Sequence, residues 1–348
     1  MRAAFITGHG GNEVVAFGDR PEPPAAQGSV LVRMKAATLN RVDLYMRDSG
    51  AGITHSLPQI MGVDGAGVVE AVDDPASDLS VGDAVTLYPA VVCGRCEWCV
   101  RGDTALCAGI RFLGEHRDGT MADFVRVPAA NVYRLPAGLA FGQGAALGVA
   151  YLTAWRMLFS RARIRPGETV LVFGIGGGVS LAALQLARFA GARVIVTSRH
   201  RDKLDRAIAL GAEHGLLTDD VIVPNLMELT GGRGVDVVIE NVGEAVWPAA
   251  MRAVTRGGRI VTCGATTGDR PSADLRRLFV RQISVMGSTL GSRDEFAQLL
   301  ACCGPGRVEP LVAQHVPLEG IHAALDTLEA GGPFGKIVID IDPDRNGL

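Results

Sequence analysis

The sequence predicts an α/β fold in two domains. Three observations support this prediction: the length of the chain, the short strand-like runs of its first third, and the alternation of strands and helices that begins near residue 165. A chain of 348 residues is longer than one ordinary hydrophobic core supports. Residues 1–130 contain short β-branched runs divided by Gly, Pro and Asp, which is typical of an antiparallel β domain. Beyond residue 165, apolar strands alternate with apolar helices, which predicts a parallel sheet covered on both faces.

The individual elements follow from these runs in chain order. The clearest strands of the first domain are SVLVRMKAA, GAGVVEAV, GDAVTLYP and ADFVRVP. In the second domain, strands and helices alternate in the order ETVLVFG, GGVSLAALQLARFAG, ARVIVTSR, RDKLDRAIALG, GVDVVIENVG, WPAAMRAVTRGG and GRIVTCGA, and RQISVMGSTL adds a last strand. We expect domains at residues 1–130 and 131–290, and a segment at 291–348 that returns to the first domain.

Composition and charge exclude several classes of protein. The formal net charge is -3 and 20% of the residues are charged, without the basic stripe that is typical of nucleic-acid binding. No apolar run approaches the roughly 20 residues that span a bilayer. The N-terminal MRAAFITGHG lacks the apolar core and cleavage pattern of a secretory signal. We therefore expect a cytoplasmic protein that acts on small molecules and binds neither nucleic acid nor membrane.

Four of the seven cysteines are spaced as ligands of one metal ion. The pattern C-x2-C-x2-C-x7-C is formed by Cys93, Cys96, Cys99 and Cys107. Gly94 and Gly102 allow the chain between them to fold back. Four thiolates fill the tetrahedral shell of zinc and leave no position for a substrate, so we expect one structural Zn²⁺ per chain, in a lobe at about residues 90–110. An iron–sulfur cluster is the main alternative, and four free thiols are a simpler one.

A glycine-rich turn joins the first strand of the second domain to its first helix. The loop contains Gly174, Gly176, Gly177 and Gly178, followed by Val179. Glycine lets the backbone turn tightly and approach a pyrophosphate, and the helix N-terminus offers free N–H groups to the phosphates. A tight turn alone would also use glycine. The place of this turn, at the first crossover of a parallel α/β series, predicts dinucleotide binding.

The end of the next strand predicts which dinucleotide binds. An NAD enzyme usually has an acidic residue about 20 residues beyond the loop, where it holds the ribose hydroxyls. This chain has Ser198 and Arg199 there, with Lys203 close behind. A carboxylate would repel a 2′-phosphate, whereas hydroxyl and guanidinium groups bind one. NADP(H) is therefore the expected cofactor, and an exposed basic turn is the alternative.

A four-cysteine lobe ahead of a dinucleotide-binding domain resembles the medium-chain dehydrogenase/reductase superfamily. The resemblance extends over nearly the whole chain, through VGDAVTLYP, GTMADFVRVP, RPGETVLVFG, LTGGRGVDVVIENVG and FGKIVIDI. It implies a GroES-like β domain, a Rossmann domain and a substrate cleft between them. It also implies a homodimer or homotetramer, in which the strand RQISVMGST pairs across a two-fold axis.

The family's zinc alcohol dehydrogenases hold a second, catalytic zinc, and this sequence differs at each of its ligand positions. Asn40 stands where the motif C-x-x-D has its cysteine. Val63 and Asp64 replace a His-Glu pair, and Val149 replaces the last cysteine. Valine cannot ligate zinc and an amide is a poor substitute for thiolate. What remains resembles the zinc-free quinone oxidoreductases and enoyl reductases, although that branch usually lacks the cysteine lobe.

Catalysis is therefore expected from a metal-free pocket that contains Asn40, Asp43 and Tyr45. The Asn40 amide and the Tyr45 hydroxyl are candidate hydrogen-bond donors to the oxygen of an enolate, and Tyr45 or a water is the candidate source of the final proton. Asp43 either orients Asn40 or the nicotinamide ribose, or it caps the next helix. Tyr45 is otherwise a packed aromatic under the cleft.

Neighbouring polar residues and the resemblance extend this expected site. Asp64 is expected to be a hydrogen-bond partner rather than a base. Glu115 and His116 indicate either a replacement metal site or a local hydrogen-bond pair. The resemblance implies further cofactor contacts at Thr153, Asn241, Val242, Gly264, Thr289 and Leu290, and a contact with the cofactor phosphates at Lys336.

These inferences predict an NADPH-dependent oxidoreductase that reduces activated C=C bonds or quinones by hydride transfer, without a catalytic zinc. One alternative is a zinc-type alcohol dehydrogenase or carbonyl reductase, with a displaced metal or with Tyr45 as the acid. A second alternative is an NADPH-binding protein without catalysis, as some quinone oxidoreductase relatives serve as lens crystallins.

Overall fold

The computed structural model describes the whole chain except residues 54–55, 220 and 343–348. The chain divides into two compact units. We call Met1–Leu152 with Gly291–Leu348 the β unit, and Thr153–Leu290 the α/β unit.

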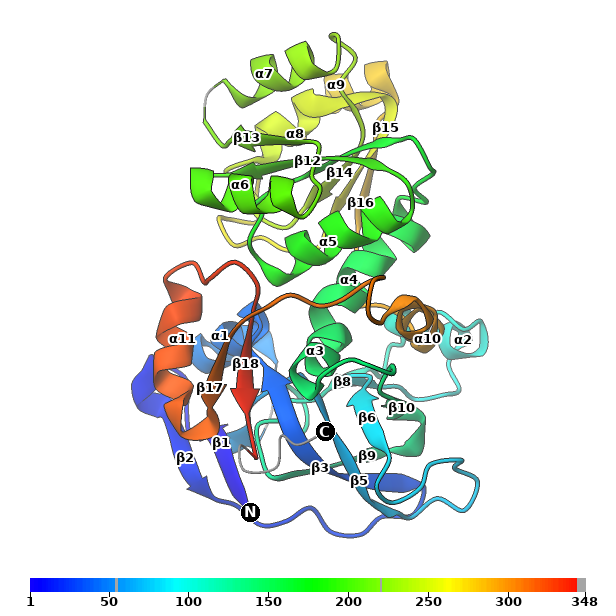
Figure 1. Cartoon of the computed structure of the whole chain (residues 1–348), viewed down its shortest axis with the longest axis vertical. Coiled ribbons are helices and arrows are strands. Elements are labelled where there is room, and N and C mark those ends of the chain that lie inside the picture. The colour runs from blue at the N-terminus through cyan, green and yellow to red at the C-terminus, as the bar shows by residue number, and fades with distance from the viewer. Residues whose placement is uncertain (54–55, 220, 343–348) are drawn as a thin grey trace. The chain divides into compact units, whose positions relative to one another are not determined.

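Antiparallel strands build the β unit around one central strand. Its larger sheet has the order β10-β6-β5-β3-β18-β17, with β9 also pairing with β3, and its smaller sheet has the order β2-β1-β4. β3 (Ser29–Thr38) is central because it pairs with β5, β9 and β18. Figure 1 shows β18, in red, beside the blue β3, so the last segment of the chain lies in the same sheet as the first. The other strands are β1 (Arg2–Ile6), β2 (Val15–Asp19), β4 (Gln59–Ile60), β5 (Asp64–Val72), β6 (Ala84–Leu87), β7 (Ala90–Val91), β8 (Arg111–Phe112), β9 (Phe124–Pro128), β10 (Val132–Arg134), β17 (Val312–Pro317) and β18 (Lys336–Asp340).

Short helices complete the β unit. α1 (Arg41–Asp48) follows β3, and α11 (Ile321–Glu329) packs on β17 and β18. α3 (Phe141–Ala146) contacts β3, β5 and β18, so the boundary expected at residue 130 moves to residue 152. The remaining helices here are α2 (Glu97–Val100) and α10 (Arg293–Cys302), and α4 (Leu152–Trp155) begins at the unit's boundary. Within the described residues, no helix is long and apolar enough to cross a membrane.

The α/β unit has the parallel sheet that the sequence predicts. Its strand order is β13-β12-β11-β14-β15-β16, and every neighbouring pair is parallel. Figure 1 shows the strands between α5 and α6 on one side and α7 and α8 on the other. The strands are β11 (Thr169–Val172), β12 (Arg193–Ser198), β13 (His214–Leu217), β14 (Val235–Glu240), β15 (Val254–Thr262) and β16 (Ser284–Gly287). The helices are α5 (Gly178–Phe189), α6 (Arg201–Ala209), α7 (Ile222–Leu229), α8 (Trp247–Ala253) and α9 (Leu275–Arg281).

The strand order places a topological switch point beside β11. The chain runs outward from β11 to β12 and β13, and then returns to β14 on the other side of β11. Ligands of open parallel sheets bind outside the carboxyl ends of the strands at such a point. The glycine loop follows β11 directly, so the fold places it at this position.

Candidate active site and cofactor loop

The segment KAATLNRVDLYMR leaves the central strand β3 and enters α1, and Asn40 occupies the position that caps this helix. The Asp43 carboxylate accepts a hydrogen bond from the Asn40 backbone N–H at 2.8 Å. An acidic side chain in the first turn satisfies a free N–H group and interacts favourably with the helix dipole. The sequence left open whether Asp43 orients its neighbours or caps the helix, and in the structure it caps α1.

The Asn40 side chain joins a buried cation to a buried anion. Its Oδ1 accepts a hydrogen bond from Lys336 Nζ at 2.6 Å, and its Nδ2 donates to Asp64 Oδ2 and to the Thr38 carbonyl oxygen, both at 3.1 Å. An ammonium only donates and an ionised carboxylate only accepts, so these neighbours fix the orientation of the amide. Both amide hydrogens are committed to protein groups. The expected role of Asn40 as a donor to a substrate oxygen therefore does not fit this geometry.

Asp64 and Lys336 are both enclosed by protein, with 0% and 5% of their surfaces exposed. Asp64 Oδ1 also accepts hydrogen bonds from the backbone N–H and the hydroxyl of Thr38, at 3.2 and 2.7 Å. Burial raises the pKa of Asp64 and lowers the pKa of Lys336, while their mutual attraction opposes both shifts. Asp64 is thus a hydrogen-bond partner, as expected. Lys336, expected at the cofactor phosphates, has its ammonium in this network and also donates to the Leu39 carbonyl oxygen at 2.8 Å.

The positions at which zinc-dependent relatives carry their catalytic ligands lie together in the β unit. Asn40 is hydrogen-bonded to Asp64, and a Cβ on Gly148, the neighbour of Val149, would lie 3.0 Å from Asp64 Cβ. Val63 is buried. The side chains present are an amide already bound to an ammonium, one carboxylate and two valines. This set does not fit a zinc site.

Two further carboxyl groups are buried near this network. Burial raises the pKa of Asp43 to about 7, although the hydrogen bond from Asn40 works in the opposite direction. Burial also raises the pKa of Glu115 to about 7. The Glu115 carboxyl makes no hydrogen bond to any residue that the structure describes. Both carboxyl groups therefore exchange a proton near neutral pH rather than near pH 4.

His116 and Tyr45 lie outside the hydrogen-bond network around Asn40. His116 Nδ1 accepts a hydrogen bond from the Phe112 backbone N–H at 3.2 Å, and the two rings are in contact. His116 therefore bonds to Phe112 and not to Glu115, so the hydrogen-bond pair expected of these two neighbours is not formed. Tyr45 is 41% exposed on α1, so it is not the packed aromatic of the alternative interpretation.

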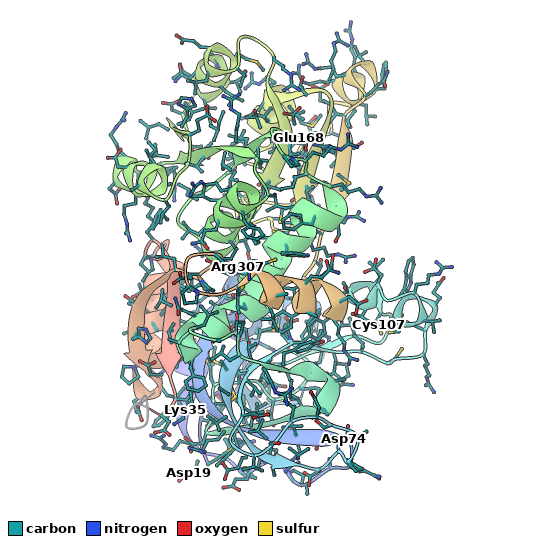
Figure 2. All side chains as sticks on the ribbon, turned by 45° about the vertical axis from the view of Figure 1, so that its right-hand side comes forward. Asp19, Lys35, Asp74, Cys107, Glu168 and Arg307 are labelled. Atoms are coloured by element: carbon teal, nitrogen blue, oxygen red, sulfur yellow. The ribbon has the colours of Figure 1, made fainter. Side chains whose placement is uncertain are left out.

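The four cysteines lie in one cluster, on the lobe that contains α2. Figure 2 labels Cys107 there, and the four Sγ atoms all lie within 4.8 Å of one another. Cys96 Sγ and Cys99 Sγ are 3.6 Å apart. Zn–S bonds of about 2.3 Å in a tetrahedron place sulfurs roughly 3.8 Å apart, so the cluster has the dimensions of a zinc site. Gly94 and Gly102 have φ angles of 72° and 82°, in the left-handed region that lets the loop fold back.

No comparable cluster of ligands accompanies Glu115 and His116. Across the described residues, the four cysteines are the one group of three or more His, Cys, Asp or Glu side chains whose ligand atoms gather closely enough to hold a metal ion. His116 Nδ1 is therefore engaged in a hydrogen bond with Phe112 and is not part of such a cluster.

The glycine loop of the α/β unit lies between β11 and α5. Gly174 and Gly176 have φ angles of 66° and 119°, a region that other residues rarely adopt. Gly177 caps α5, whose first two residues are Gly178 and Val179. A Cβ on Gly176 would lie 3.0 Å from Lys203 Cδ, so the Lys203 side chain lies against the loop. A backbone free of Cβ atoms with a lysine beside it fits the pyrophosphate of a dinucleotide.

The ends of β14 and β15 bring further predicted residues to this loop. A Cβ on Gly174 would lie 3.1 Å from Val242 Cγ2, and one on Gly264 would lie 3.0 Å from the Asn241 carbonyl oxygen. Asn241 Nδ2 donates to Ser180 Oγ at 3.0 Å, in the first turn of α5. The predicted residues of three strand ends thus form one surface.

Glu240 holds this surface together, and the sequence analysis did not single it out. The residue is fully buried at the end of β14, and its carboxylate accepts hydrogen bonds from the backbone N–H groups of Val242 at 2.5 Å and Gly243 at 2.6 Å. It also accepts from the Thr262 hydroxyl at 2.9 Å, at the end of β15. A carboxylate directly after the apolar run VVI was the signal available in the sequence.

The other predicted cofactor residues lie at the edges of this surface or away from it. Ser198 ends β12 and its Oγ accepts a hydrogen bond from the His200 backbone N–H at 3.1 Å, while Arg199 is exposed. Thr153 is the first residue of the α/β unit. Thr289 and Leu290 follow β16, which β14 and β15 separate from β11.

Two family models match the chain. A zinc-binding dehydrogenase model matches residues 178–303, and an alcohol dehydrogenase GroES-like domain matches residues 26–137. A quinone oxidoreductase of Rattus norvegicus is 31% identical over 350 residues, with 97% of each chain covered. A zinc-type alcohol dehydrogenase-like protein of Schizosaccharomyces pombe is 33% identical, with 90% of this chain and 91% of that protein covered. The solved structure of an NAD-dependent alcohol dehydrogenase is 39% identical, with a TM-score of 0.95 and with 98% of this chain and 100% of that chain covered.

A GroES-like β unit and a parallel-sheet unit with a glycine loop define a dehydrogenase-type oxidoreductase. The chain belongs to the medium-chain dehydrogenase/reductase superfamily, among the quinone oxidoreductases and zinc-type alcohol dehydrogenase-like proteins. The resemblance drawn from the sequence is thereby confirmed, and so is the fold class.

We expect a Glu115→Gln variant to change how stability depends on pH. Because burial raises the pKa of Glu115 from 4.5 to about 7, the folded chain binds this proton more tightly than the unfolded chain does. Wild-type stability should therefore fall relative to the variant as the pH rises from about 4.5 to about 7, by about 3 kcal/mol in total. Urea unfolding of both proteins across this range measures the difference. Parallel pH profiles would contradict the assignment.

Proposed function

We propose that this protein is an NADPH-dependent reductase of C=C bonds conjugated to a carbonyl group, or of quinones, that works without a catalytic zinc. The observation that carries the proposal is the Asn40 amide held between Lys336 and Asp64, at the position where zinc-dependent relatives have a thiolate ligand. In place of a metal ion, the cationic group at this position is the Lys336 side chain, which donates a hydrogen bond to the amide.

Reduction of a conjugated double bond requires less charge stabilisation from such a site than exchange between an alcohol and a carbonyl. In zinc-dependent exchange between a carbonyl and an alcohol, the metal acts as a Lewis acid and contributes several kcal/mol of charge stabilisation at the oxygen. NADPH, when bound, supplies a hydride to the β carbon of the acceptor. The electron pair of the double bond then moves to the carbonyl oxygen as an enolate, and a proton is added at the α carbon. Hydrogen-bond donors can stabilise this delocalised charge.

Side chains of the β unit can donate the hydrogen bond, deliver the proton and position these groups. Tyr45, exposed on α1, offers its hydroxyl as the donor to the enolate oxygen and as the source of the proton. Asn40 and Asp43 are positioning residues in this scheme, because they hold the start of the helix that carries Tyr45. Lys336 keeps a positive charge behind the amide, which favours the developing negative charge.

A carbonyl reductase or alcohol dehydrogenase is the second candidate function. The observation that favours it is the NAD-dependent alcohol dehydrogenase structure, which is 39% identical to this chain. In that function Tyr45 would be the acid that protonates the carbonyl oxygen.

We further propose that the chain forms a homo-oligomer through the free edge of the parallel sheet. β16 is the edge strand, and Val285 on it is 39% exposed. Leu275 and Phe279 on the preceding helix α9 are each 70% exposed. An edge strand beside exposed large apolar side chains is a surface that a second copy can cover.

A panel of acceptors, with NADPH and NADH tested side by side, is the experiment that tests the proposed reaction. We expect NADPH oxidation with enones or quinones and little activity with simple aldehydes or alcohols. Activity should survive dialysis against a chelator that strips accessible zinc. A preference for simple alcohols, or activity that is lost on chelation and restored only by added zinc, would count against the proposal.

We expect one zinc ion per chain, and its loss in a Cys107→Ser variant. Because four thiolates leave no coordination position for a substrate, the variant should destabilise the lobe but keep enone reduction per folded chain within about threefold. Elemental analysis of the purified protein measures the metal. Cys302→Ser, which alters a thiol outside the cluster, is the control and should retain the zinc. Loss of turnover in a folded, zinc-free chain is the opposing result.

An Arg199→Gln variant tests the cofactor preference. A charged hydrogen bond to a 2′-phosphate is worth about 1.5–3 kcal/mol, so NADPH affinity should fall about tenfold or more while NADH affinity stays unchanged. Nicotinamide fluorescence titrations measure both affinities. Arg165→Gln, which removes an exposed arginine ahead of β11, is the charge-matched control. An equal loss for both cofactors would contradict the preference for NADP(H).

A further inference from the structure

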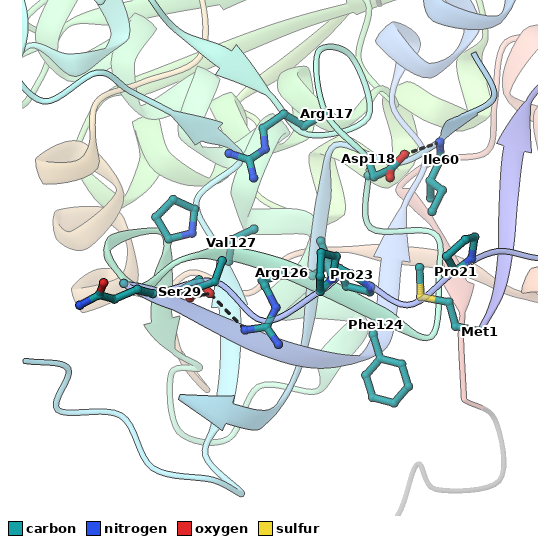
Figure 3. A pocket seen from close by; sticks show the side chains of 17 residues that line it. Met1, Pro21, Pro23, Ser29, Ile60, Arg117, Asp118, Phe124, Arg126 and Val127 are labelled. Carbon is teal, nitrogen blue, oxygen red and sulfur yellow. Dashed lines mark hydrogen bonds between the residues drawn. The ribbon is translucent and has the colours of Figure 1, made fainter. Parts of the chain in front are cut away.

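A cavity of the β unit has a lining that includes none of the residues of the Asn40 network. It has a volume of ≈ 560 Å³ and opens between residues 21–29, β9 and the loop 117–119 (Figure 3). Cavities of about 300–1,000 Å³ are the size of small-molecule sites. Its lining includes none of the residues assigned above to catalysis, to the cofactor or to the metal.

Apolar side chains form much of the wall. They include Met1, Pro21, Pro23, Pro24, Ile60 and Phe124. Figure 3 shows Met1, Pro21 and Pro23 along one side of the cavity. The proline rings fix φ in the 21–24 segment, so this part of the wall loses little conformational freedom when a ligand is bound. The cavity therefore offers a pre-formed surface to the apolar body of a ligand.

Arg117 brings a positive charge to this wall. Its guanidinium makes no hydrogen bond or ion pair with any residue in the described part of the chain. A second guanidinium, that of Arg126, lines the cavity with 10% of its side chain exposed, and it is held by Asp73 and by Ser29 Oγ. The structure thus leaves Arg117 as the side-chain cation of the lining that is available to a ligand, while the Met1 ammonium donates to the Arg20 carbonyl oxygen.

The one carboxylate of the lining is already engaged. Asp118 Oδ1 accepts hydrogen bonds from the Ile60 backbone N–H at 3.1 Å and from Gln59 Nε2 at 3.2 Å. Its role in holding the loop 117–119 against β4 is visible as the dashed contact in Figure 3. The ionic side chains of the lining are therefore two guanidinium groups and one carboxylate, which favours an anion.

We propose that this cavity binds an amphipathic monoanion, a carboxylate with an aliphatic or aromatic body. The carboxylate pairs with the Arg117 guanidinium, whose planar fork matches it in bidentate geometry. The body of the ligand lies against the prolines and Phe124, where its burial removes apolar surface from water. The site goes beyond the proposed reductase activity and shares no residue with it.

The binding of 2-naphthoate to the full-length chain tests this site. Calorimetric titrations are made with NADP⁺ and NAD⁺ both present in excess, so that the cofactor site is blocked whichever cofactor the enzyme prefers. The neutral isostere 2-naphthamide is titrated in parallel. We expect Arg117→Gln to weaken 2-naphthoate binding about tenfold and to leave 2-naphthamide binding unchanged. Arg165→Gln, at an exposed arginine outside the cavity, changes the net charge equally and should alter neither.

A cavity-filling variant makes the test independent of the arginine. Ala26 lines the cavity and is exposed, so Ala26→Trp adds volume to the site without disturbing the core. It should abolish binding of both probes while circular dichroism shows an unchanged fold. The proposal is overturned if wild type does not bind 2-naphthoate, or if both variants bind it as tightly as wild type does.

Discussion

A buried ammonium joined to a buried carboxylate through a single amide is the interaction on which the β unit depends. Lys336 opens β18, Asp64 opens β5, and Asn40 follows β3, the strand that lies between the other two. Removing one partner of such a buried pair leaves an uncompensated charge, which costs about 3–5 kcal/mol. The segment after residue 290 is therefore needed both for the central sheet and for the site, and the α/β unit is inserted between two parts of one core.

Local patterns predicted the parts of this structure that are local in the chain. The structure contains the predicted turn at the glycine loop, the clustering of the four cysteines and the alternation of β11, α5, β12 and α6, because turn glycines, ligand spacing and apolar periodicity act within about 20 residues. The contact between Lys336 and Asn40 spans 296 residues, and no local signal announces it. For the same reason the sequence assigned the Asn40 amide to the substrate, although its hydrogens are donated within the protein.

Some element boundaries were missed for a different reason, the conflict between propensity and tertiary packing. The helix expected over WPAAMRAVTRGG ends at Ala253, and β15 begins at Val254, because two β-branched residues and two glycines favour leaving the helix. α3 was not predicted because FGQGAA is rich in glycine. A Cβ on Gly144 would lie 2.2 Å from Leu135 Cδ1, so this glycine lets the helix pack closely in the β unit. Close packing therefore explains Gly144, and helix propensity alone does not predict α3.

The cysteine lobe and the Asn40 network share no residue. The four cysteines can therefore be retained while the residues at the catalytic zinc positions change. α2 buries none of its residues, so the lobe lacks a core of its own and its fold rests on the sulfur cluster. That requirement holds whatever reaction the enzyme performs. At the Asn40 network, by contrast, an ammonium cannot lower the pKa of a coordinated alcohol as a bound metal does. It can still favour negative charge that is spread over several atoms. Burial raises the pKa of Asp43 and of Glu115 to about 7, so neither carboxyl group carries a full negative charge at neutral pH. Fewer full negative charges in this region mean less repulsion of any negative charge that develops nearby.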